Sequence, residues 1–191
     1  MKAFNRIGWT GALALALVLG GAAQAEETTT TSYSPLAFNA FAGLGYYNLS
    51  SSTNSGTGVD VSRSNGRLGA AFGGDLGFRL SPSVAIVALA EYVPLFNTNS
   101  DDVGAHIYTV GGGFRVQPAP WAQFLFAGGY TGSGGGTNGN NDLHGWALKA
   151  IGFYPVAAGF GPYLQLGYNH LKNDFYGLNV FTANAGLSFS L

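Results

Sequence analysis

The stretch LNVFTANAGLSFSL, residues 178–191, alternates strictly between two kinds of side chain. One parity is apolar and consists of Phe181, Ala183, Ala185, Leu187, Phe189 and Leu191. The other is mostly small or polar and includes Thr182, Asn184, Gly186, Ser188 and Ser190. Because successive side chains of a strand point to opposite faces, this pattern predicts a strand with one apolar face. Such a face would point into the core of a soluble domain or toward lipid in a membrane barrel.

The composition favours the membrane alternative. Charged residues make up 9% of the 191 residues, whereas about 25% is usual in soluble proteins. The chain also contains 31 Gly, 14 Phe and 10 Tyr. A length of 191 residues fits one domain. A net charge of −1 argues against nucleic acid as a partner. The absence of cysteine excludes disulfides, thiolate metal sites and an acylated-cysteine anchor.

The N-terminus has the three parts of a secretory signal peptide. Lys2 and Arg6 are basic, residues 11–21 are apolar, and Ala23-Gln24-Ala25 is a small-x-small cleavage site. We expect residues 1–25 to be removed and residues 26–34, which are acidic and rich in Thr, to form a flexible periplasmic tail. Beyond residue 25 no apolar run is long enough for a spanning helix. An exported chain with a membrane-like surface then needs a closed β-barrel to satisfy its backbone in lipid.

Alternation recurs along the whole chain and predicts an all-β, eight-stranded antiparallel up-and-down barrel over residues 35–191. The expected strands are residues 37–49, 67–80, 84–93, 105–116, 121–130, 143–154, 163–171 and 178–191. Long loops rich in Gly, Ser and Asn are expected at residues 50–66, 94–104, 131–142 and 172–177. The other connections are short. Outer-membrane barrels have this asymmetry, with short periplasmic turns and longer extracellular loops.

The stretch 67–80 indicates what fills the barrel. Asp75 and Arg79 share their parity with several glycines, opposite an apolar face. Glycine weakens a water-facing strand, but inside a narrow barrel it makes room for long charged side chains. A soluble lipocalin-like barrel would instead place apolar residues inside. The polar side chains that would have to lie inside are Arg79, Glu91, Arg115, Gln123, Lys149 and Gln165.

Aromatic residues collect near both ends of the predicted strands, as expected at two membrane interfaces. The set near the long loops is Tyr46, Tyr92, Tyr130, Trp146 and Tyr168, and the set near the turns is Phe38, Phe78, Phe114, Trp121, Tyr163 and Phe189.

The signal peptide, the eight alternating strands and the terminal Phe189-Ser190-Leu191 resemble the small outer-membrane β-barrel family of OmpX and the OmpA barrel domain, within the porin-family outer-membrane proteins. The resemblance covers residues 35–191 and is architectural, because the family shares no catalytic motif. It implies a monomer in outer-membrane lipid, assembled by the barrel-assembly machinery through its C-terminal strand. The family usually ends on an aromatic residue, whereas this chain ends on Leu191.

No catalytic, cofactor or metal site emerges from the sequence. A lipid-modifying barrel enzyme would need a histidine with a serine and a carboxylate at the rim, but His106, His144 and His170 have no serine two positions on. Carboxylates and amides at Asp101, Asp102 and residues 140–142 lack EF-hand spacing, and the glycines of residues 132–136 precede no phosphate-binding Lys-Ser/Thr motif.

We therefore expect a non-enzymatic outer-membrane barrel with a structural or surface-interaction role, and an extracellular ligand, if one exists, would bind the long loops. The lumen would be plugged by a network of Asp75, Arg79, Glu91, Arg115 and Lys149, because buried charges need partners. In strand 143–154, a bulge near Gly152 would be needed to turn Phe153 outward. A narrow-pore channel for small solutes is the main alternative, and a lipid-modifying enzyme is a more distant one.

Overall fold

In a computed structural model of the protein, residues 35–53, 61–96, 106–134, 143–156, 159–173 and 176–190 are described. Eight strands account for nearly all of them. They are β1 (Leu36–Thr53), β2 (Val61–Ser81), β3 (Val84–Pro94), β4 (His106–Ala119), β5 (Ala122–Gly134), β6 (Leu143–Phe153), β7 (Phe160–Lys172) and β8 (Tyr176–Ser190). The expected signal peptide and tail, residues 1–34, lie outside the described residues.

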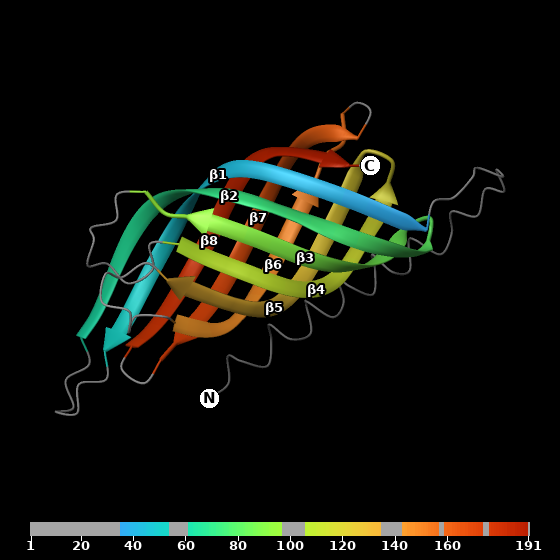
Figure 1. The fold of residues 1–191 in the computed structure, drawn as a ribbon. Coiled ribbons are helices and arrows are strands. Elements are labelled where there is room, and N and C mark those ends of the chain that lie inside the picture. Colours follow the sequence, from blue (N-terminus) through green and yellow to red (C-terminus); the bar gives the residue numbers. More distant parts are fainter. Residues whose placement is uncertain are drawn as a thin grey trace, which may run out of the picture.

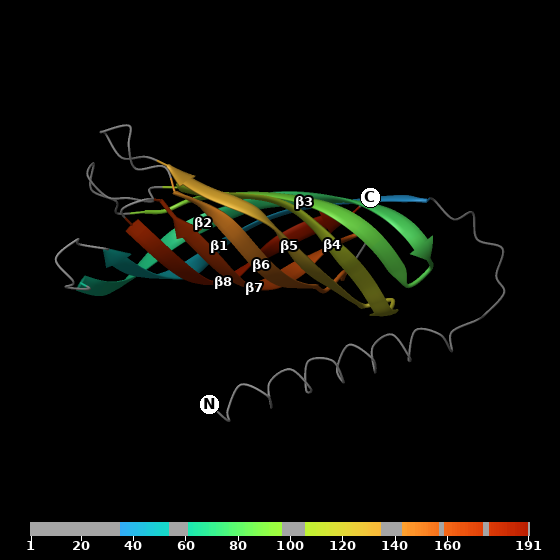
Figure 2. The same cartoon turned by 90° about the horizontal axis from the view of Figure 1, so that it is seen from below.

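The strands form one closed barrel in chain order. Every neighbouring pair is antiparallel, including β1 with β8, which closes the barrel through pairs from Asn39 with Ser190 to Thr53 with Tyr176. Figure 1 shows the tilted strands from the side, and Figure 2 shows the same cylinder after a quarter turn. The eight-stranded antiparallel barrel predicted from the alternation is therefore confirmed.

Short connections lie together at one end of the barrel. At this turn end β2 passes to β3 through Pro82 and Ser83, and β4 passes to β5 just after Ala119. The β6 to β7 connection contains Gly159 with φ 81°, and a Cβ there would collide with the carbonyl of Ser190. Strand β1 begins and β8 ends at this same end (Figure 1). No helix long and apolar enough to cross a membrane occurs among the described residues.

At the opposite end, the loop end, the strands extend further than the sequence suggested. Residues 50–53 pair with residues 61–64, from Ser50 with Ser64 to Thr53 with Val61. The expectation of a loop over residues 50–66 was therefore wrong at both edges, and only residues 54–60 fall outside the described part. Ser, Thr and Asn are typical of loops, yet here they lie in strands: residues 50–53 of β1 pair with residues 61–64 of β2 on one side and with residues 176–179 of β8 on the other.

The other three expected loops are shortened in the same way. Thr131 and its three successors belong to β5, and Lys172 belongs to β7. Pro94 ends β3 and Gly177 lies in β8. Leu95, Phe96 and Asn173 are described outside the strands, and Tyr176 begins β8. The rest of these expected loops falls within residues 97–105, 135–142 and 174–175, which lie outside the described residues.

The wall of the barrel is apolar on its outer face. Outward side chains include Leu44, Phe72 and Leu164, which are 65%, 50% and 69% exposed. Their neighbours in sequence point inward and are mostly buried. Most of the expected aromatic residues also face outward near the two ends. Tyr163 is the exception: the prediction that it belongs to the outer aromatic set was wrong, because it is 1% exposed and lies inside the barrel.

Candidate functional site

The five residues expected in the lumen occupy inward positions on four strands. Asp75 of β2, Glu91 of β3, Arg115 of β4 and Lys149 of β6 are all buried. Arg79 is half-buried and lies at the turn end, where it lines a small pocket together with Arg115 and Gln123. The alternation that places apolar side chains outward thus places these charges inside.

The lower of two ion pairs lies toward the turn end. Arg115 Nη2 contacts Asp75 Oδ1, although β2 and β4 are separated by β3. Asn39 of β1 completes the group: with its amide oriented to satisfy both neighbours, its oxygen accepts a hydrogen bond from Arg115 Nη2 at 3.0 Å and its nitrogen donates to Ser190 Oγ. A charged pair with additional hydrogen bonds is the arrangement in which buried ions are tolerated.

The upper ion pair crosses the barrel. Lys149 Nζ lies 2.8 Å from Glu91 Oε2, and both side chains are almost fully buried. Gln165 Nε2 of β7 donates to Glu91 Oε1 at 2.8 Å. Three strands, β3, β6 and β7, are therefore tied together through one carboxylate.

An apolar layer lies beside these ionic groups. Phe41, Phe153 and Tyr163 meet inside the barrel, with ring centroids 5.1 Å apart for Phe41 and Tyr163 and 6.2 Å for Phe41 and Phe153. Gly73 makes room for the Phe41 ring, since a Cβ at that position would collide with it. We call this layer the aromatic layer; its buried members are Phe41, Ala85, Val87, Leu89, Leu125, Ala127, Ile151, Phe153 and Tyr163.

The position of Phe153 corrects one expectation. A bulge near Gly152 was expected to turn Phe153 outward, but pairing continues without a shift through Gly152, which faces Phe124 and Leu164. Phe153 is 2% exposed and Ile151 is 1% exposed. An apolar residue at an inward position is stable here because the ring has aromatic partners inside the barrel.

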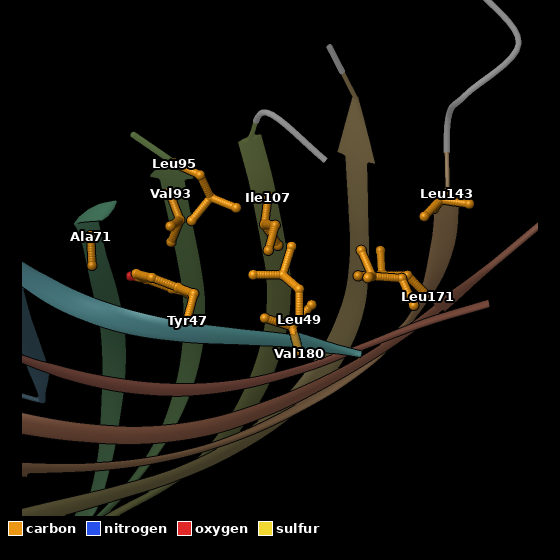
Figure 3. Packing of buried hydrophobic residues seen from close by; sticks show 10 residues of the cluster. Tyr47, Leu49, Ala71, Val93, Leu95, Ile107, Leu143, Leu171 and Val180 are labelled. Atoms are coloured by element: carbon orange, nitrogen blue, oxygen red, sulfur yellow. The ribbon is translucent and has the colours of Figure 1, made fainter. Parts of the chain in front are cut away.

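A second apolar cluster fills the lumen toward the loop end. It contains Tyr47, Leu49, Ala71, Val93, Leu95, Ile107, Leu143, Leu171, Leu178 and Val180. Figure 3 shows these side chains projecting into the barrel from several strands. We call this cluster the upper apolar layer. The interior therefore combines two apolar layers with buried ion pairs.

Polar side chains without charge also lie inside, and the charge pattern gave no sign of them. Thr131 Oγ1 donates to the Tyr108 carbonyl at 2.9 Å and lies 3.3 Å from Thr109 Oγ1. Asn169, fully buried on β7, lies 3.5 Å from the same hydroxyl. Their inward parity is the signal in the sequence that could have found them, although Thr131 falls in the stretch 131–142 expected to be a loop.

The three histidines lie on the outer face near the loop end. His144 Nδ1 and Tyr130 Oη are 2.5 Å apart, and His170 Nδ1 lies 2.8 Å from Asn179 Oδ1. The His106 ring lies beside that of Tyr92, with centroids 5.6 Å apart. These partners are phenols and an amide.

The oxygen-ligand stretch considered in the sequence, Asp101, Asp102 and residues 140–142, lies outside the described residues. Within the described ranges, no group of three or more His, Asp or Glu side chains lies close enough to hold a metal ion.

No family model and no curated protein sequence matches this chain. Solved structures do. The attachment invasion locus protein Ail of Yersinia pestis shares 14% identity with a TM-score of 0.47, over 79% of this chain and 98% of that one. Neisserial surface protein A shares 11% identity with a TM-score of 0.49, over 82% and 97%. The N-terminal barrel domain of Pseudomonas aeruginosa OprF shares 11% identity with a TM-score of 0.43, over 78% and 97%.

These matches are similarities of fold between chains that share few residues. The fold resemblance to small outer-membrane barrels, expected from the sequence, agrees with the closed strand order of this chain.

Proposed function

We propose that this protein is a non-enzymatic β-barrel of the bacterial outer membrane, with its lumen closed and with a structural or surface-interaction role. The observation that supports this proposal most is that the burial pattern is the reverse of that in a water-soluble protein. Large apolar side chains cover the outside of all eight strands, while charges such as Glu91 and Lys149 lie inside. Removing a Leu or Phe side chain from water is worth about 1.5–3 kcal/mol, so an apolar surface around the whole barrel requires a nonaqueous surrounding.

The orientation follows from the two ends of the barrel. The turn end, which also carries the start of β1 and the end of β8, would face the periplasm, and the loop end would face outward. In this proposal residues 1–25 are the cleaved signal, residues 26–34 a periplasmic tail, and the monomer is inserted by the barrel-assembly machinery through β8. The connections at the loop end would contact any extracellular ligand.

Closure of the lumen is supported by what fills it. The aromatic layer and the upper apolar layer contain side chains that are at most 6% exposed. The two ion pairs fill more of the cross-section of the lumen, because each pair joins two strands that are not neighbours and so extends across the interior. In an eight-stranded barrel the interior is only wide enough for side chains. A narrow channel is the competing function, and the buried polar set that includes Thr109, Thr131 and Asn169 is the feature that favours it.

The test is folding in detergent without the signal segment. We expect a β-rich circular dichroism spectrum and faster gel migration before heating than after it. A monomer that is soluble in water without detergent would contradict the proposal. For the enzymatic alternative, loss of turnover of a lipid or peptide substrate on changing His106, His144 or His170 to Ala would show that the protein is an enzyme.

A further inference from the structure

A small cationic patch lies on the outer face of the β6 to β7 hairpin, near the loop end. His144 is paired directly with Lys172, and Trp146 is paired with His170. These positions face outward, because the alternate residues Leu143 and Leu171 are buried inside. Among Lys and Arg side chains whose exposure the structure describes, Lys172 is the exposed one; Arg67, Arg79, Arg115 and Lys149 are half-buried or buried.

Each imidazole in the patch contacts a side chain of the neighbouring strand, β5 for His144 and β8 for His170. Asn179 Oδ1 lies 2.8 Å from His170 Nδ1 and accepts a hydrogen bond of the same length from Tyr168 Oη. When Tyr130 Oη donates to His144 Nδ1 across their 2.5 Å contact, the proton of that ring is on Nε2. The ring of His144 then offers a fixed donor beside the Lys172 ammonium group.

An apolar groove begins just below this patch on the same strands. Its upper part, about 520 Å³, is lined by Leu148, Ala150 and Tyr168 among others. Its lower part, about 430 Å³, continues past Gly152 and Leu164 toward the turn end. The two parts share Phe126, Ala150 and Leu166. Each part has the volume of an ordinary ligand pocket, about 300–1,000 Å³.

The groove exists because β6 carries small outward residues between two strands with large ones. Ala150 and Gly152 lie on β6, while Phe124 and Phe126 of β5 flank them on one side and Leu164 and Leu166 of β7 on the other. At Gly152 a Cβ would meet only the Phe124 ring, at 3.6 Å, which is ordinary contact. The space over Gly152 is therefore open.

We propose that this face binds one lipid whose phosphate head group lies at His144 and Lys172 and whose acyl chain lies in the groove. The proposal rests on the proposed membrane location. A lipid fits better than a protein partner because the charge lies at one end only, beside Trp146 and Tyr168 at the level of the head groups. From Leu148 to Gly152 the strand alone runs about 13 Å, so the groove is long and narrow like an acyl chain.

The test uses the signal-free barrel folded in an uncharged detergent, with native mass spectrometry as readout. The probes are phosphatidic acid, diacylglycerol with the same chains, and inorganic phosphate. We expect one phosphatidic acid per barrel, bound at least tenfold more tightly than diacylglycerol, a factor equivalent to about 1.4 kcal/mol. Inorganic phosphate should not compete at equal concentration. Equal binding of the two lipids, full competition by phosphate, or a dimer in place of the lipid complex would overturn the proposal.

Three variants, with two control variants, separate the contribution of the head group from that of the acyl chain. Lys172→Met and His144→Gln should each weaken phosphatidic acid several-fold, whereas His106→Gln, which changes the outward histidine of β4, should not. Gly152→Leu should reduce binding of both lipids by filling the groove, whereas Ala88→Leu, at an outward position of β3, should not. Unchanged binding in Lys172→Met and Gly152→Leu would refute the site. Failure of the unmodified chain to fold in detergent would instead refute the membrane location.

Discussion

Glu91 and Lys149 come from strands that are not neighbours in the barrel, yet their charged groups lie 2.8 Å apart in its interior. Because β3 and β6 are not hydrogen-bonded to each other, this ion pair links the two strands across the interior of the barrel; we call it the cross-brace. Gln165 adds a third strand to the same carboxylate. The stability of the barrel and the closure of its lumen therefore depend partly on one pair.

The first prediction concerns loss of that carboxylate. Glu91→Ala leaves the buried Lys149 ammonium group uncompensated, and breaking a buried pair in this way costs about 3–5 kcal/mol. Urea unfolding in lipid vesicles should show this loss in the free energy of unfolding. The double variant Glu91→Ala with Lys149→Met should recover much of it, because no unpaired charge remains. A single variant as stable as the unmodified barrel would contradict the cross-brace.

The second prediction concerns the aromatic layer. Phe153→Ala removes a ring that packs on Phe41 and Tyr163 and should lower the free energy of unfolding by about 3–5 kcal/mol. Phe126→Ala is the matched control, since that ring faces outward and lipid can fill the space it leaves. If the two variants lost the same stability, Phe153 would not be part of a packed interior.

The third prediction concerns the outer surface. Leu76→Arg places a charge near the middle of the apolar band, where it should destabilise the barrel in a bilayer by about 2–4 kcal/mol. Leu80→Arg, near the turn end of the same strand, should cost about 0–1 kcal/mol. The measurement is unfolding in vesicles. An equal effect at both positions would mean that the outer face does not cross a membrane.

Much of this fold was predictable from sequence because alternation assigns every residue of a strand to one of two faces. The strand that contains Asp75 shows this clearly, since charge and glycine share one parity and leave the other apolar. Alternation failed where both faces carry apolar residues. Ile151 and Phe153 were indistinguishable from lipid-facing residues without knowledge of the rings they meet across the barrel.

Which charged residues form ion pairs could not be predicted from the sequence, for a different reason. Parity places Asp75, Arg79 and Arg115 on the inward face without saying which of them pair, and in the structure Arg115 contacts Asp75. Which inward positions meet depends on strand tilt and on the offset between strands, and parity contains neither. The loop boundaries failed because Ser and Thr at residues 50–53 suit a strand as well as a loop.

The closed lumen is tested most directly by planar-bilayer recording of the signal-free barrel, with heat-sensitive gel migration of the same sample as proof of folding. We predict no steady, large conductance from the unmodified protein. Steady, large conductance from the unmodified barrel would contradict the account and show that the protein is a channel.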